Sequence, residues 1–163
     1  MKYELIELEE SEFETDAFEH EIRLGEFRHY YVLCDNKPHL KVEVDFKRLF
    51  DDAVIYNNYL AIGTFDRVYF INLSDFQITK LEVEMYFGYF VVFKEVLYIL
   101  DGKGIIAFNE SLNEIWRNHS LAIDGVIFQE MLDDEIMRIS CEMDPPGGWV
   151  DRMINIKSGE IVG

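Results

Sequence analysis

The chain has 163 residues, of which 49% are hydrophobic and 15% aromatic. A chain of this length is expected to form one domain that buries roughly 68–70% of its unfolded surface, and its composition excludes global disorder. Its formal net charge of -17 disfavours binding to nucleic acids and to anionic membranes, because cationic side chains supply the affinity for both. We therefore expect no nucleic-acid or membrane partner, and any protein partner is expected to be basic.

The cysteines and the first residues indicate a reducing compartment. Cys34 and Cys141 each lie in an apolar run, which favours two buried free thiols over a disulfide. The first residues, MKYELIE, turn acidic at once and do not resemble a signal peptide. No apolar run approaches the ~18 residues that a membrane-spanning helix needs. These features predict a cytoplasmic location.

The first fifty residues combine a strand signal, an acidic segment and a hairpin. Residues 2–8 fit a strand, whereas residues 9–21 are heavily acidic and fit either a short helix or an exposed loop. Two further strands are predicted at 28–33 and 40–46, because the second run alternates apolar and polar residues and a turn sequence separates the two. This hairpin resembles a later one 39 positions on. Residues 1–50 are therefore interpreted as a degenerate first unit of a repeat.

The clearest units of the repeat follow directly. Residues 51–86 contain four short runs rich in β-branched and aromatic residues, separated by turn formers, which is typical of strands. Val54-Ile55-Tyr56 returns 37 positions later as Val91-Val92-Phe93, and the following runs return with it. Residues 87–122 are therefore predicted to be a second copy of the same unit.

A third copy is predicted over residues 123–163. The end of the second copy, marked by Asn109, returns 46 positions later at Asn155. The offset grows by nine residues because an insertion separates the second and third strands of this copy. A fourth strand is expected at residues 160–162. All units are assigned to one domain, residues 1–163.

The repeat predicts an all-β fold of four-stranded antiparallel sheets stacked on one another, since one sheet cannot cover both faces of its own apolar strands. The apolar first strands and the strand endings at residues 70–75 and 155–159 resemble the blades of β-propellers, of the quinoprotein or tryptophan–aspartate type. Propellers usually have four to eight blades. A small four-bladed ring, an open stack and a sandwich all fit this chain. The resemblance implies a binding scaffold and specifies no ligand.

The insertion in the third copy is the candidate binding site. Its prolines are rigid, its glycines permit unusual backbone shapes, and its tryptophan offers a large amphipathic ring. Two interpretations remain open: a recognition loop with Trp149 as its anchor, or a stiffened hairpin whose Trp149 folds back over the core. The candidate binding residues are Asp144, Pro145, Pro146, Gly147, Gly148, Trp149, Asp151 and Arg152.

The sequence gives no signal for catalysis, for a metal or for a cofactor. None of the four histidines pairs with another His or a Cys at zinc-ligand spacing, and neither cysteine lies in a nucleophile motif. Asp101-Gly102-Lys103-Gly104 lies between two strands and is interpreted as a hairpin turn. Residues 133–135, Asp-Asp-Glu, fit a solvated turn better than a calcium site. We therefore name no catalytic residue, no metal ligand and no cofactor.

Two classes of function remain. The first is a non-enzymatic acidic module that binds a basic protein, for example an inhibitor or immunity protein against a basic toxin or nuclease. The alternative is a small-ligand binder or enzyme with its pocket beside residues 144–152. A homo-oligomer formed through exposed sheet edges is a further expectation.

Overall fold

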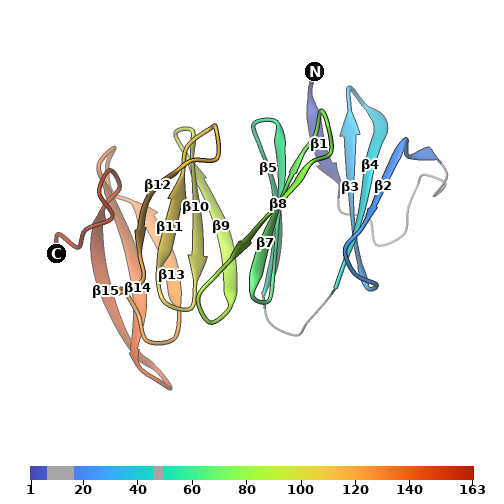
Figure 1. Ribbon diagram of the computed structural model, residues 1–163. Helices are drawn as coiled ribbons and strands as arrows, with labels where there is room; N and C mark the ends of the chain where they lie inside the picture. Colours follow the sequence, from blue (N-terminus) through green and yellow to red (C-terminus); the bar gives the residue numbers. More distant parts are fainter. Residues whose placement is uncertain (7–16, 46–49) are drawn as a thin grey trace.

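The computed structural model describes residues 1–6, 17–45 and 50–163 of a nearly all-β protein. Its strands form four sheets that stack face to face in chain order, with the first and the fourth sheet at opposite ends (Figure 1). The predicted all-β fold of repeated sheets is confirmed, and the sheets form an open, propeller-like stack rather than a closed ring. In the described part of the chain, no helix has the length and apolar character needed to cross a membrane.

The first sheet contains the predicted hairpin together with one parallel strand. In spatial order its strands are β1 (Tyr3–Ile6), β3 (Arg28–Cys34), β4 (Lys37–Val44) and β2 (His20–Arg23). The β3–β4 pair is antiparallel, as predicted, but β2 pairs in parallel with β4. β1 and β2 are the two edge strands of this sheet, and β3 and β4, which follow them in the sequence, lie between them. Of the segment 9–21, residues 9–16 lie outside the described residues, and His20 and Glu21 belong to strand β2 rather than to the predicted helix or loop.

The second and third sheets are two copies of one antiparallel meander. The second contains β5 (Asp51–Tyr56), β6 (Tyr59–Thr64), β7 (Arg67–Asn72) and β8 (Ile78–Glu82), and the third contains β9 (Phe87–Phe93), β10 (Val96–Asp101), β11 (Ile105–Phe108) and β12 (Glu114–Asn118). Val54 lies opposite Ala61, and Val91 lies opposite Tyr98, so strand register repeats at the spacing found in the sequence. The strands of the two units therefore pair in equivalent ways.

The fourth sheet has one strand fewer than predicted. It consists of β13 (Val126–Met131), β14 (Ile136–Asp144) and β15 (Gly148–Asn155). The strand expected at residues 160–162 is reduced to a single bridge between Ile154 and Ile161. Backbone hydrogen bonds still hold this segment along β15, since the N–H of Val162 donates to the carbonyl of Met153 at 2.8 Å. It therefore occupies the place of a fourth strand without strand geometry along its length.

A shared turn ends the third strand of each of the last three units. The side-chain oxygens of Asn72, Asn109 and Asn155 each accept the backbone N–H two residues later, at 2.8, 3.0 and 2.9 Å. Asparagine favours this local bond because its short side chain closes the turn on its own backbone. The recurrence of Asn109 at Asn155 in the sequence thus marks an equivalent structural position.

Three apolar clusters lie between successive sheets and hold the stack together. Strands β6 and β10 contribute alternate side chains to the clusters on either side of their sheets, so both faces of these strands are covered. Leu60 and Ile62 face the first sheet while Ala61 faces the third. Burial of each large aliphatic side chain contributes about 1.5–3 kcal/mol to folding. Each sheet therefore depends on its neighbours for stability.

Candidate binding site beside the β14–β15 hairpin

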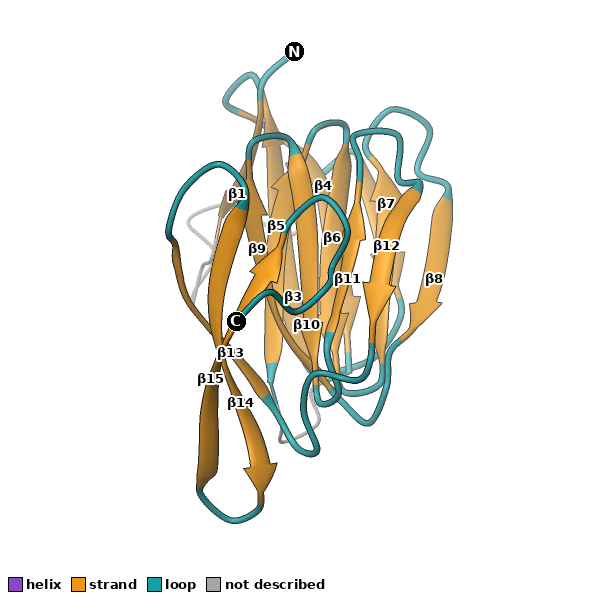
Figure 2. Ribbon diagram, turned by 90° about the vertical axis from the view of Figure 1, so that its left-hand side faces the viewer, coloured by secondary structure: helices purple, strands orange, loops and turns teal. Residues whose placement is uncertain are grey.

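The predicted insertion forms the turn of a long hairpin. The ends of β14 and β15 project beyond the other sheets (Figure 2). Gly147 has a φ of +98°, and its N–H donates to Oε1 of Glu142 at 2.7 Å. A Cβ on Gly148 would lie only 2.5 Å from Cβ of Asp144, so the turn requires glycine there. Pro145 and Pro146 are exposed at the tip.

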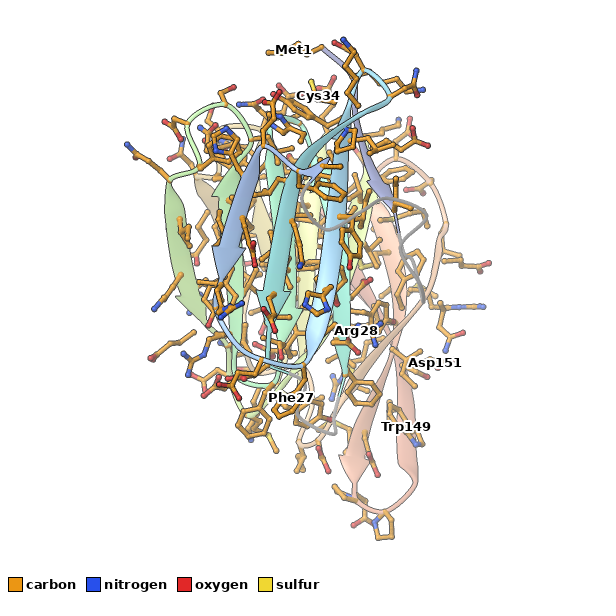
Figure 3. The ribbon with its side chains drawn as sticks, turned by 90° about the vertical axis from the view of Figure 1, so that its right-hand side faces the viewer. Met1, Phe27, Arg28, Cys34, Trp149 and Asp151 are labelled. Carbon is orange, nitrogen blue, oxygen red and sulfur yellow. The ribbon has the colours of Figure 1, made fainter. Side chains whose placement is uncertain are left out.

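Strand alternation separates the predicted site residues onto two faces. Trp149 lies opposite Glu142 and Asp151 lies opposite Ser140, whereas Arg152 lies opposite the fully buried Ile139. Trp149 and Asp151 therefore share one face, and Arg152 belongs to the face that packs against the third sheet. Figure 3 shows Trp149 and Asp151 along the projecting hairpin. The eight predicted residues therefore lie at the tip of the hairpin and on both of its faces.

Asp151 and Arg152 contact neighbouring side chains, although Nε of Arg152 is buried without a hydrogen-bond partner among the described residues. Asp151 Oδ1 accepts the hydroxyl of Ser140 at 2.6 Å. Nη2 of Arg152 contacts Sδ of Met143 at 3.5 Å. Trp149 enters none of the three apolar clusters and remains 44% exposed, with Cη2 of its ring above Gly125. The structure thus leaves the tryptophan partly exposed to solvent, close to the turn of the hairpin.

A cavity of about 300 Å³ lies beside Trp149. It is bordered by the start of β5, by the start of β9, and by residues of β13 and β14, so three successive units build it. Among the described residues, four aromatic rings line it, from Phe50, Tyr86, Tyr89 and Trp149. The rings of Phe50 and Tyr86 are 5.9 Å apart between centroids. The site is therefore a largely aromatic pocket. It lies on the side of the stack from which the β14–β15 hairpin projects.

Backbone hydrogen bonds fix the floor of this pocket. The N–H of Gly102 donates to the carbonyl of Tyr86 at 3.0 Å, the N–H of Gly125 donates to Gly102 at 2.8 Å, and the N–H of Glu142 donates to Gly125 at 3.0 Å. Gly125 has a φ of +125°, and a Cβ there would lie 3.2 Å from the Tyr86 hydroxyl and 3.4 Å from Cη2 of Trp149. Glycine thus allows the two rings to converge over a backbone that links the third and fourth sheets.

One of the three carboxylates in the pocket is structural. Asp101 is 1% exposed, and its oxygens accept the N–H groups of Lys103 at 2.9 Å, Gly104 at 2.8 Å and Glu84 at 3.1 Å. Nε2 of His119 lies 2.8 Å from its Oδ2. These contacts use its acceptor capacity and hold the turn between β10 and β11. The interpretation of residues 101–104 as a hairpin turn is confirmed.

The other two carboxylates, of Asp124 and Glu142, keep uncompensated charge. Asp124 Oδ1 accepts the Tyr86 hydroxyl at 2.9 Å. Among residues 1–6, 17–45 and 50–163, no Lys, Arg or His forms an ion pair with Asp124, Glu142 or the adjacent Asp144. Burial, the hydrogen bond to Asp124 and the nearby negative charges raise the pKa of Tyr86 to about 12. The phenol is therefore a neutral donor at physiological pH, in a negative environment.

The acidic turn of residues 133–135, at the other end of β14 from the hairpin turn, is partly neutralised. Asp133 Oδ1 accepts the N–H groups of Glu135 and Ile136 at 2.7 and 2.9 Å. Lys94 pairs with Asp134, and Lys157 pairs with Glu135 at 3.1 Å. Within the described ranges, no group of three or more His, Cys, Asp or Glu side chains is placed to hold a metal ion. The local bonds of this turn favour the interpretation as a solvated turn.

Sequence reasoning found Trp149 but missed the residues that make it part of a pocket. Tyr86, Asp124, Gly125 and Glu142 lie in three separate segments, and none belongs to a recognisable motif. The only local signal was the Asp124-Gly125 pair at the junction between two units.

Comparison of the sequence with models of known protein families found no match, and comparison with curated protein sequences found none either.

Proposed function

We propose that this protein is a non-enzymatic, cytoplasmic module that binds a basic protein, most concretely as an inhibitor or immunity protein against a basic toxin or nuclease. The observation that carries the proposal is the charge of -17 together with unneutralised carboxylates beside a half-exposed tryptophan. Both cysteines are free thiols, which suits a reducing compartment.

Uncompensated charge beside the exposed ring of Trp149 supports the hairpin side as the binding surface. Asp124, Glu142 and Asp144 form no ion pair with a cation of the described residues, and Asp124 and Glu142 line the pocket together with that ring. Uncompensated charge at a surface raises association rates with an oppositely charged partner by about 10–10³-fold. Large rings such as Trp149 commonly dominate binding energy at the centre of an interface. Charge would thus guide the partner and the ring would anchor it.

Affinity capture tests this proposal. The intact protein is immobilised and exposed to lysate of its native cells, and proteins released by a salt gradient are identified and purified. We expect a basic protein whose affinity for the purified module falls steeply with ionic strength, because exposed charges are screened beyond ~8 Å at physiological salt. A partner that is acidic, or a dissociation constant independent of salt, would refute the proposal.

Matched aromatic variants identify the surface used. Trp149→Ala is expected to weaken binding of the captured protein by at least about tenfold. Phe27→Ala removes a 72% exposed ring at the lower end of the first sheet (Figure 3) and should leave the affinity within about twofold. Equal losses in both variants would contradict binding at the hairpin.

A second candidate function, binding of a small ligand, is favoured by the pocket itself. A cavity of about 300 Å³ lies at the lower limit of the range for small-molecule sites, roughly 300–1,000 Å³. Thermal stabilisation by a small cationic metabolite, combined with no salt-sensitive protein partner, would favour this alternative.

A further inference from the structure

The chemistry of the pocket beside Trp149 is complementary to a cation. Its lining contains three acidic side chains and no Lys, Arg or His from the described part of the chain. A neutral apolar group would leave Asp124 and Glu142 partly desolvated without compensation, and an anion would be repelled. A cationic group both neutralises these charges and is attracted to the faces of the surrounding rings.

The number and placement of acceptors favour a guanidinium group over an ammonium. Oδ1 of Asp124 and Oε1 of Glu142 already accept protein hydrogen bonds, which leaves the second oxygen of each as an acceptor on two different elements. A guanidinium is planar, stacks on aromatic rings and presents five N–H donors in fixed directions, whereas an ammonium is compact and strongly hydrated. Two separate carboxylates beside the rings of Tyr86 and Trp149 therefore suit arginine.

The pocket is also organised before binding. The hydrogen bonds through Tyr86, Gly102, Gly125 and Glu142 fix the backbone beneath the rings. The bond from Tyr86 to Asp124 and the bond from Gly147 to Glu142 orient the two carboxylates. A preformed site binds more tightly because less conformational freedom is lost on binding. We infer that this pocket accepts one arginine side chain of the basic partner. This inference rests on the proposed function, because a basic protein must supply the arginine.

A small peptide probe tests the pocket directly. We would titrate the intact, ¹⁵N-labelled protein with acetyl-Gly-Ser-Arg-Ser-Gly-amide and with the same peptide carrying citrulline, a neutral isostere of arginine. The arginine peptide should shift the amide resonances of Gly125 and Glu142 and change the fluorescence of Trp149. Citrulline should bind at least about tenfold more weakly, because the charge-assisted hydrogen bonds are lost. Equal effects of both peptides would overturn the inference.

Matched charge variants distinguish the contribution of the pocket to peptide binding from the effect of the overall net charge. Asp124→Asn with Glu142→Gln keeps an acceptor for the bonds from Tyr86 and Gly147, and it should weaken the arginine peptide by about tenfold or more. Glu82→Gln with Glu160→Gln makes the same change in net charge at exposed sites outside the pocket, and should change affinity by less than about twofold. Equal losses in both double variants would mean that no specific pocket is used.

The same variants distinguish failure of this inference from failure of the proposed function. If the captured basic protein binds with strong salt dependence but loses no more affinity with the pocket variant than with the control, the proposed function holds and the arginine pocket is wrong. If the arginine peptide binds in the pocket as described but no salt-sensitive basic protein is captured, the pocket holds as an arginine site and the proposed function is wrong.

Discussion

The close contact between Gly63 and Phe87 allows a direct test of whether packing between the second and third sheets stabilises the protein. Gly63 lies in β6 of the second sheet, and the fully buried Phe87 begins β9 of the third. A Cβ on Gly63 would lie 2.1–2.3 Å from three atoms of the Phe87 ring. Favourable carbon–carbon contacts lie at about 3.5–4.0 Å, so Gly63→Ala must displace the ring or separate the sheets by more than 1 Å, on the order of one bond length.

We expect Gly63→Ala to lower the free energy of unfolding by about 1–2 kcal/mol. Overpacking of a close-packed core costs about 1–3 kcal/mol. The loss of chain entropy in the unfolded state on replacing glycine offsets this by about 0.4–1 kcal/mol. The expected loss is a substantial fraction of a total stability of about 5–15 kcal/mol.

Urea unfolding followed by circular dichroism measures this effect in a double-mutant cycle. Phe87→Leu removes ring atoms that the new methyl group would meet, and alone should destabilise by about 1–2 kcal/mol. The double variant should be more stable than the sum of the two single effects by about 1–2 kcal/mol, because the smaller side chain makes room for the methyl group. Strict additivity, or a Gly63→Ala protein as stable as the wild type, would refute the packing described here.

Three other properties can be measured on the same protein. Burial raises the pKa of Cys141 to about 11, so only one of the two thiols should react with Ellman's reagent in the native protein at pH 8 and both should react in urea; two fast thiols in the native state would contradict this. The pKa of Tyr86, raised from 10.0 to about 12, contributes stability that is fully present below pH 10 and is lost as the pH rises toward 12, and ultraviolet titration should show a lower value after Asp124→Asn. An unchanged tyrosine titration would exclude a carboxylate charge beside the Tyr86 hydroxyl. Gly159→Ala should destabilise by about 1–3 kcal/mol and shift the fluorescence of Trp116, because its Cβ would lie 2.3 Å from that ring and its φ is +76°; unaltered emission and stability would argue against this contact.

Much of the fold was predictable because the repeat consists of short sequence patterns, each recognisable from a few neighbouring residues. Strands such as β6 and β10 are short, apolar and bounded by turn residues, and equivalent positions in the two units pair in the same register. The asparagine turns at Asn72, Asn109 and Asn155 need only their own neighbouring backbone, so their recurrence was visible in the sequence. Features that depend on distant contacts, such as the parallel placement of β2, left no local signal.

The binding site was only partly predictable for the same reason. The prolines, glycines and Trp149 mark an unusual hairpin, which a local pattern can indicate. Period-two alternation in β15 already implies that Trp149 and Arg152 face opposite sides, but the start of that strand was uncertain from the sequence. The carboxylates of Asp124 and Glu142 are known to be unneutralised only because the structure shows which cations lie near them.

The sequence by itself determined the β-sheet class, the number and spacing of the units, their dependence on one another and the strongly acidic character, because each of these follows from composition or from short periodic patterns. Tertiary structure alone decided that the sheets form an open stack, that the last strand is reduced to a bridge, and that residues from three units surround one pocket. The physical reason is that these features depend on packing and hydrogen bonds between residues tens of positions apart. The free energies of those contacts depend on three-dimensional geometry, which a short sequence pattern does not specify.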